Sequence, residues 1–191
     1  TKAMIACAEV AYTVANSRQW GITVPGFQVD FEKIVARKNE IVSSFRGGAT
    51  KGLEKTEGLS IFYGTAAFNG PKVVNIQLRT GSTETITADQ IFINTGASPK
   101  IPDLPGLAQV PYLTNTTLLD LQVLPSHLII LGGSYIGLEF GQLFRRLGCQ
   151  VTIIERTVLL KREDADVSAA MKKIMEGAGI TVHTGASVKL V

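Results

Sequence analysis

Residues 128–155, LIILGGSYIGLEFGQLFRRLGCQVTIIE, decide the fold of this 191-residue chain. The stretch opens with the apolar run 128–131, which is typical of a buried strand, and continues directly into a glycine-rich turn at 132–137. Apolar residues then recur at helical spacing up to the next glycine, and a second apolar run, 151–154, ends at Glu155. This order predicts a strand–helix–strand unit with parallel strands.

The turn has the spacing of a dinucleotide-binding fingerprint, with one departure. Gly132 permits the tight turn and Gly137 lets the helix pack closely on the sheet, but Ser134 occupies the middle glycine position. The free amides at the start of the helix favour a pyrophosphate. Glu155, 18 residues after Gly137, is placed to accept hydrogen bonds from an adenosine ribose. The alternative interpretation is a glycine-rich turn without a ligand.

The acid at position 155 also bears on the choice of cofactor. A carboxylate there repels the 2′-phosphate of NADPH and therefore favours NADH. Arg156 follows it directly and can partly offset that repulsion, so both nucleotides remain candidates.

The remaining elements follow from periodicity and turn residues. A helix over 166–178 and a strand over 180–183 extend the unit to βαβαβ, and Ala-rich residues 1–16 predict a further helix. Asp30 is expected to cap a second helix that ends at Gly47 and Gly48. Strands are expected over 59–63, 74–78, 84–88 and 91–94.

Proline residues between 99 and 111 mark a crossing between domains, and 113–126 reads as a connection. The predicted domains are therefore 1–112 and 127–191.

Composition excludes several classes of protein. Hydrophobic residues make up 45% and charged residues 18%, which suits a globular core, and the net charge of +3 comes without a basic stripe for nucleic acid. No apolar run reaches about 18 residues, so we expect no membrane span, and no signal-peptide pattern is present, so we expect a cytoplasmic protein. Cys7, Cys149, His127 and His183 are too dispersed for a metal site and are expected to be structural.

Several motifs together resemble the flavoprotein disulfide reductases, a family that includes dihydrolipoamide dehydrogenase, glutathione reductase and mercuric reductase. They are TGASP at 95–99 with the prolines that follow, and YIGLE at 135–139. Residues 1–12 resemble the helix after the redox cysteine pair, of whose C-x4-C-x-P-[ST]-K pattern only the last two letters are matched. The stretches 44–48 and 111–119 resemble the mercuric-reductase-like branch.

This resemblance implies an α/β fold in two parts. A partial FAD-binding domain of helices and an antiparallel β meander precedes a Rossmann-type βαβαβ unit for NAD(P)H. It also implies three catalytic residues: Lys2 and Glu139, which pair beside the flavin, and Tyr135, which covers the flavin until the nicotinamide arrives. With the glycine turn included, the candidate cofactor-binding residues are Lys2, Ala66, Thr95, Gly96, Ala97, Gly132, Gly133, Ser134, Tyr135, Ile136, Gly137, Glu139, Glu155, Arg156 and Val188.

The function so implied is that of a flavin-dependent pyridine nucleotide-disulfide oxidoreductase, with FAD and NAD(P)H as cofactors. The chain is expected to be an internal part of a longer homodimeric enzyme and to be inactive alone, because the cysteine pair is not among its residues. The electron acceptor is expected to be a small molecule, a disulfide or a metal ion. The alternative is a truncated, non-catalytic dinucleotide-binding module.

Overall fold

The computed structural model describes residues 1–191. The chain forms two compact units, one made of Thr1–Ile41 together with Pro99–Val191 and the other of Val42–Ser98. One unit holds a parallel sheet and the other an antiparallel sheet, so the expected mixed α/β class is confirmed. The predicted domains, 1–112 and 127–191, were defined by the cofactor that each would bind. The two compact units are defined by packing alone, so they do not test that division, and it stays a prediction.

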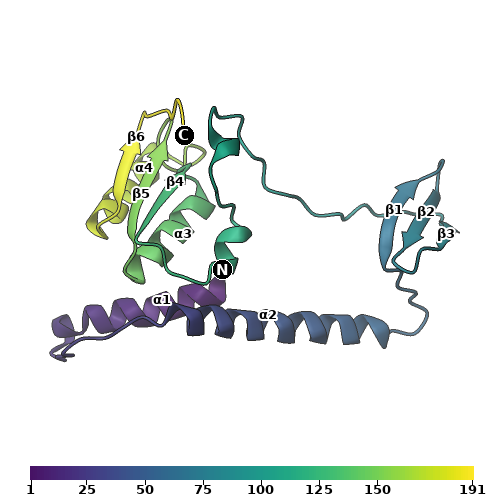
Figure 1. Ribbon diagram of the computed structural model, residues 1–191, viewed down its shortest axis with the longest axis horizontal. Coiled ribbons are helices and arrows are strands. Elements are labelled where there is room, and N and C mark those ends of the chain that lie inside the picture. Colours follow the sequence, from purple (N-terminus) through teal and green to yellow (C-terminus); the bar gives the residue numbers. More distant parts are fainter. The chain divides into compact units, whose positions relative to one another are not determined.

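The parallel sheet has the order β4-β5-β6, formed by His127–Leu131, Gln150–Glu155 and Thr181–Thr184. Helix α3 (Tyr135–Arg146) connects the first two strands and α4 (Ala165–Gly177) connects the last two (Figure 1). All five elements lie within a few residues of their predicted positions. Because the strands are parallel, their carboxyl ends share one edge of the sheet, where the glycine turn begins.

Helix α3 is held tightly against this sheet. A Cβ placed on Gly141 would lie 3.2 Å from Cδ1 of Ile153, so the glycine allows close approach of helix and strand. Phe144 on the same helix is fully buried, and its ring centroid lies 5.9 Å from that of Phe31. Aromatic contacts of this kind add to the burial of apolar surface, which anchors α3 and thereby fixes its N-terminus.

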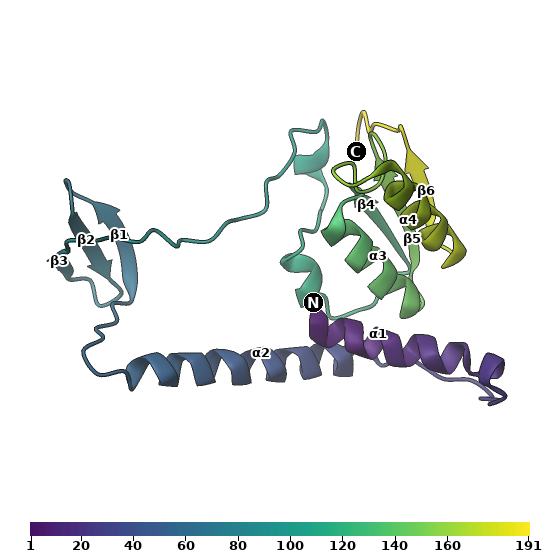
Figure 2. The ribbon, with the colours of Figure 1, turned by 180° about the vertical axis from the view of Figure 1, so that it is seen from behind.

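Helix α1 (Lys2–Ala15) packs against α3 within the same unit (Figures 1 and 2). Its buried residues are Met4, Ala8 and Ala11, which recur every three or four positions and form one apolar stripe. The predicted helix is confirmed.

Helix α2 (Phe31–Glu54) begins as predicted, after Asp30. The Asp30 carboxylate accepts a hydrogen bond from the Lys33 amide at 3.1 Å and pairs with its ammonium at 2.9 Å. These contacts with Lys33 lower the pKa of Asp30.

The predicted end of this helix at Gly47 and Gly48 is wrong, because α2 continues for six residues beyond them. Neither glycine takes a positive φ, and no atom lies within 4 Å of the position of an added Cβ. Glycine costs a helix only about 1 kcal/mol relative to alanine. Ala49, Lys51, Leu53 and Glu54 favour a helix, and α2 also continues through Gly52.

The second unit is built on an antiparallel meander, as expected. Strands β1 (Gly64–Phe68), β2 (Val73–Leu78) and β3 (Thr83–Thr87) pair in the order β1-β2-β3. The strands predicted over 59–63 and 91–94 are wrong, since neither segment forms a strand of a sheet. An apolar run becomes a strand only where a partner supplies hydrogen bonds, and sequence pattern does not reveal that partner.

The segment 99–126 contains two short 3₁₀ helices, Leu107–Gln109 and Thr117–Asp120. The buried side chain of Lys38 contacts the second of these helices, and its ammonium lies 3.4 Å from the Asp120 carboxylate. No helix of the chain combines the length and apolar character needed to cross a bilayer.

Candidate functional site

A cavity of about 780 Å³ opens at the carboxyl edge of the parallel sheet. Its size lies within the usual range of ligand sites, about 300–1,000 Å³. The glycine turn, the end of β5, the loop 156–162 and the segments 102–104 and 186–188 line it. Seven of the sequence-predicted residues meet here: Gly132, Gly133, Ser134, Tyr135, Glu155, Arg156 and Val188.

The glycines of the turn are required by close approach of backbone and side chains. Gly132 has a φ of +114°, which other residues rarely adopt. A Cβ on Gly133 would lie 2.4 Å from Cδ2 of Leu159, and a Cβ on Gly137 would lie 2.3 Å from the Gly132 carbonyl oxygen. A larger residue at position 137 would meet rigid backbone and displace the start of α3, whereas one at position 133 would push the Leu159 side chain aside.

Ser134, the departure from the fingerprint, lies immediately before α3 with an extended backbone at φ −94°. Its hydroxyl makes no capping bond to the helix, and the side chain is exposed in the cavity wall. Serine therefore fits without backbone strain and leaves its hydroxyl available as a donor to a ligand.

The Glu155 carboxylate connects the glycine turn at 132–137 with the backbone just after β5. One carboxylate oxygen accepts a hydrogen bond from the Gly133 amide at 2.8 Å, and the other accepts from the amide and hydroxyl of Thr157 at 2.9 and 3.0 Å. Burial acts to raise the pKa of Glu155, but the hydrogen bonds outweigh it and the pKa is lowered. The group is therefore ionised at neutral pH and holds the glycine turn in place.

Tyr135, at the first position of α3, lies half exposed at the cavity and donates a hydrogen bond to the carboxylate of Glu163. That contact with Glu163 raises the pKa of the Tyr135 phenol. The tyrosine is thus held toward the loop that follows β5.

Sequence reasoning missed two cations in the cavity wall, Lys161 and Arg162. With Arg156 they place three positive side chains beside the N-terminus of α3, against the acids Glu155 and Asp103. Both the helix end and the cations attract phosphate groups. A Lys-Arg pair in the loop after the second strand was the available signal, but its position over the cavity depends on the path of that loop.

The residues present therefore fit a dinucleotide. The backbone leaves no room for a side chain at Gly137, the N-terminus of α3 lies at the cavity, and the cations supply charge for phosphates. Glu155 and Val188 stand on the walls of the same cavity, where a ribose and an adenine can be contacted.

The other predicted residues lie outside this cavity. Ile136 and Glu139 are exposed on α3 and Lys2 is exposed at the start of α1; Lys2 and Glu139 form no ion pair in the structure. Ala66 and residues 95–97 belong to the unit Val42–Ser98 and are exposed there. The flavin-side roles of these residues stay predictions.

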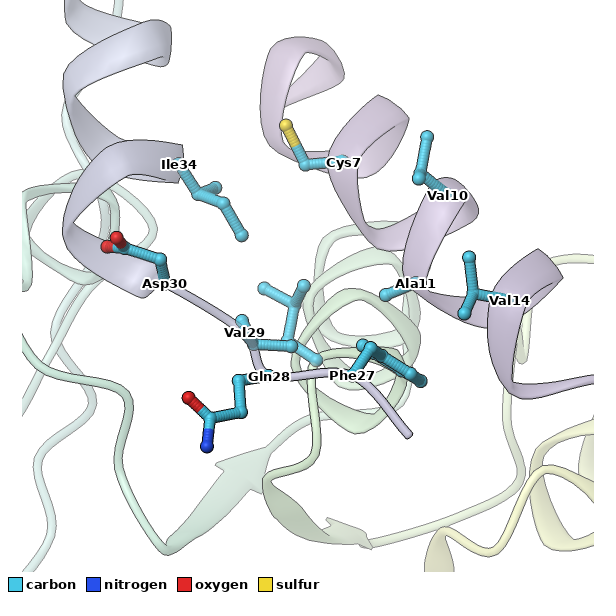
Figure 3. A pocket seen from close by; sticks show the side chains of 10 residues that line it. Cys7, Val10, Ala11, Val14, Phe27, Gln28, Val29, Asp30 and Ile34 are labelled. Atoms are coloured by element: carbon cyan, nitrogen blue, oxygen red, sulfur yellow. The ribbon is translucent and has the colours of Figure 1, made fainter. Parts of the chain in front are cut away.

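A second, shallower cavity of about 380 Å³ lies between α1, the extended residues 27–30 and the start of α2. Figure 3 shows Cys7, Val10 and Phe27 among its mainly apolar side chains, with Asp30 at its margin. Asp30 is already engaged by Lys33. This cavity brings together no set of groups for acid–base or nucleophilic chemistry.

Comparison with known proteins identifies the family. A family model described as pyridine nucleotide-disulphide oxidoreductase matches residues 1–191. The chain is 40% identical over 192 residues to a mercuric reductase of Streptomyces lividans, covering 100% of this chain and 40% of that protein. It is 36% identical over 162 residues to a probable pyridine nucleotide-disulfide oxidoreductase, RclA, of Escherichia coli K12, covering 84% of this chain and 36% of the relative.

The structural comparison agrees. The Cu(II) complex of the HOCl-induced flavoprotein disulfide reductase RclA from Escherichia coli matches with a TM-score of 0.82 at 30% identity, over 99% of this chain and 39% of that one. The chain thus spans about two fifths of the length of these relatives. The resemblance stated from the sequence is confirmed, and the chain belongs to the pyridine nucleotide-disulphide oxidoreductases, a family of flavin-dependent enzymes that bind FAD and NAD(P)H.

Proposed function

We propose that this chain is the central part of a mercuric-reductase-like flavoenzyme and that its βαβαβ unit binds the reducing nucleotide. The observation that carries the proposal is the cavity over the glycine turn, in which backbone amides, cations and Glu155 converge. In a longer protein that carries this chain, bound FAD would accept a hydride from NAD(P)H and pass the electron pair to a cysteine disulfide.

The chain's own residues would bind and orient the nucleotide. The α3 N-terminus and the hydroxyl of Ser134 would hold the pyrophosphate, and Glu155 would accept hydrogen bonds from the adenosine ribose. The three cations of the cavity wall would add charge for phosphates. Because Glu155 is ionised, it disfavours a 2′-phosphate, so NADH is the expected preference.

Tyr135, Lys2 and Glu139 would act on the flavin side. Tyr135 would exclude water from the flavin until the nicotinamide displaces it. Lys2 would place a positive charge near the flavin, which stabilises the negative charge of the reduced ring, and Glu139 would hold the Lys2 ammonium in position. Ala66, Thr95, Gly96 and Ala97 would contribute backbone contacts to FAD.

The acceptor and assembly follow from the same family assignment. The relatives are named mercuric reductase and disulfide oxidoreductase, which favours a metal ion or a disulfide as the terminal electron acceptor. We expect the longer protein to be a homodimer and cytoplasmic.

The experiment is flavin reduction by NADH in the longer enzyme that carries this chain, followed as loss of flavin absorbance in a stopped-flow instrument. Glu139→Gln should slow that step, because the neutral amide no longer fixes the Lys2 ammonium. Glu176→Gln is the matched control, since Glu176 is an exposed acid on α4 whose carboxylate pairs with Lys172. Equal rates in the wild type and in Glu139→Gln would remove Glu139 from the mechanism.

The second candidate function is a non-catalytic dinucleotide-binding module. It is favoured by a cavity that fits a nucleotide in a chain whose two cysteines are far apart in sequence. Under this alternative, NADH still binds to the chain in a titration, but the longer protein shows no bleaching of flavin by NADH.

A further inference from the structure

A single arginine ties helix α1 to helix α3. The guanidinium of Arg146, at the last position of α3, forms an ion pair with the Glu9 carboxylate and lies 4.4 Å from the centroid of the Tyr12 ring. The Arg146 side chain is 20% exposed and the Glu9 side chain 56%, so water screens the acid side of the ion pair, while the guanidinium itself is partly shielded. We refer to Glu9, Tyr12 and Arg146 as the α1–α3 clamp.

A second pair of charged residues has the same spacing on the two helices. Lys2 lies seven residues before Glu9 on α1, and Glu139 lies seven residues before Arg146 on α3. Glu9 and Arg146 are 137 positions apart in the sequence, and so are Lys2 and Glu139. Seven residues are about two helical turns, so each member of the second pair lies on the same helix face as its clamp residue, about 10 Å along the axis.

The two helices run in the same general direction. In Figure 2, α1 leads from the N-terminus toward the right, and α3 also descends from left to right toward it. Going back two turns from the clamp on both helices therefore leads to Lys2 on one and Glu139 on the other.

The rest of the α1 surface against the core is poorly suited to defining this register. Its buried residues are Met4 and two alanines, Ala8 and Ala11. Apolar contact is non-directional, and small side chains let one helix slide or rotate on another with little loss of contact area. A charged, geometrically specific contact such as the clamp can distinguish one register from the next.

We propose that Glu9, Tyr12 and Arg146 are positioning residues that hold Lys2 opposite Glu139 across the α1–α3 interface. The significance for catalysis rests on the proposed function, in which Lys2 and Glu139 act beside the flavin. The positioning itself does not depend on that function, because it is a property of the two helices alone.

The test is a zero-length carbodiimide cross-link between the Lys2 ammonium and the Glu139 carboxylate in the 191-residue chain, quantified by mass spectrometry of the digested protein. The wild type should form this link. Arg146→Gln should lower its yield about fivefold, the factor that corresponds to the loss of a partly buried ion pair and cation–π contact. Glu9→Gln, which leaves the Tyr12 contact in place, should lower it less.

Arg145→Gln is the matched control. Arg145 is the neighbouring residue on α3, and its Nε donates to the Ala178 carbonyl at 3.2 Å, away from α1. This variant should keep the wild-type yield. Circular dichroism identifies any variant that fails to fold, and the exchanged pair Glu9→Arg with Arg146→Glu should recover part of the lost yield.

The outcomes separate this inference from the proposed function. No Lys2–Glu139 link in the wild type, or an undiminished yield in both Arg146→Gln and Glu9→Gln, would overturn the positioning role. The cross-link needs no cofactor, so it stands even if flavin reduction proves independent of Glu139. In the flavin-loaded longer enzyme, Arg146→Gln should shift the flavin midpoint potential in the same direction as Lys2→Gln, whereas Arg145→Gln should leave it unchanged.

Discussion

The contact between α3 and the glycine turn can be tested with one added methyl group, in Gly137→Ala. A Cβ at this position would lie 2.3 Å from the Gly132 carbonyl oxygen and 3.2 Å from Cγ2 of Ile130. Real Cβ atoms do not approach a backbone oxygen so closely. Because that oxygen belongs to the turn and cannot rotate away, the first turn of α3 must move off the sheet.

The expected cost combines two opposing terms. Overpacking a tight site typically costs about 1–3 kcal/mol, and contact with rigid backbone favours the upper value. Replacing glycine by alanine in a helix returns up to about 1 kcal/mol. The net loss in the free energy of unfolding should therefore be about 2 kcal/mol, and NADH affinity should fall because the helix amides are displaced from the cavity.

Urea unfolding followed by circular dichroism, together with an NADH titration, measures both effects. Gly47→Ala is the matched control, because no atom lies within 4 Å of its added Cβ and the residue is in the interior of helix α2. That variant should gain about 0.5–1 kcal/mol. A Gly137→Ala protein with wild-type stability and unchanged NADH affinity would refute the reasoning.

Three further predictions concern single side chains. Glu155→Gln should lose about 1–2 kcal/mol at pH 7, because the amide has one acceptor oxygen where the carboxylate has two, so the Gly133 amide or the Thr157 donors lose their partner. Since the pKa of Glu155 is lowered from 4.5, the difference should be present above that pH and vanish as the pH falls through the folded value, which urea unfolding at pH 7 and pH 3 would show. Ser168→Ala should cost about 1–3 kcal/mol, measured in the same way, because the buried Ser168 hydroxyl donates to the Leu159 carbonyl at 2.6 Å. Burial raises the pKa of the Cys149 thiol, so thiol reagents at neutral pH should modify Cys7 first, and rapid labelling of Cys149 in the folded chain would contradict this.

The parallel unit shows how far local pattern carries a prediction. Each of its strands is a short apolar run, and each helix is bounded by turn residues or glycines, so the information needed lies within a few residues. The roles of Gly132 and Gly137 could likewise be assigned in advance, because a fingerprint specifies where the turn must be tight and where the helix approaches the strand. The family followed from these motifs together with 95–99.

The errors have the opposite origin. The runs 59–63 and 91–94 have the residues of strands but no strand partner, and a hydrogen-bonded ladder cannot be inferred from one of its members. The end of α2 was misplaced because Gly47 and Gly48 are compatible with both a helix interior and a helix end. Local preference there is about 1 kcal/mol, too small to decide.

The sequence by itself determined the βαβαβ order, the glycine turn, the acid at its edge and membership of the family. Tertiary structure alone decided that Glu155 binds the Gly133 amide, that Tyr135 is held by Glu163, and that Arg146 joins α3 to α1. These contacts join residues 22, 28 and 137 positions apart. Secondary-structure pattern is set by neighbours along the chain, whereas such contacts exist only after the sheet and helices have packed and brought distant side chains within hydrogen-bonding distance.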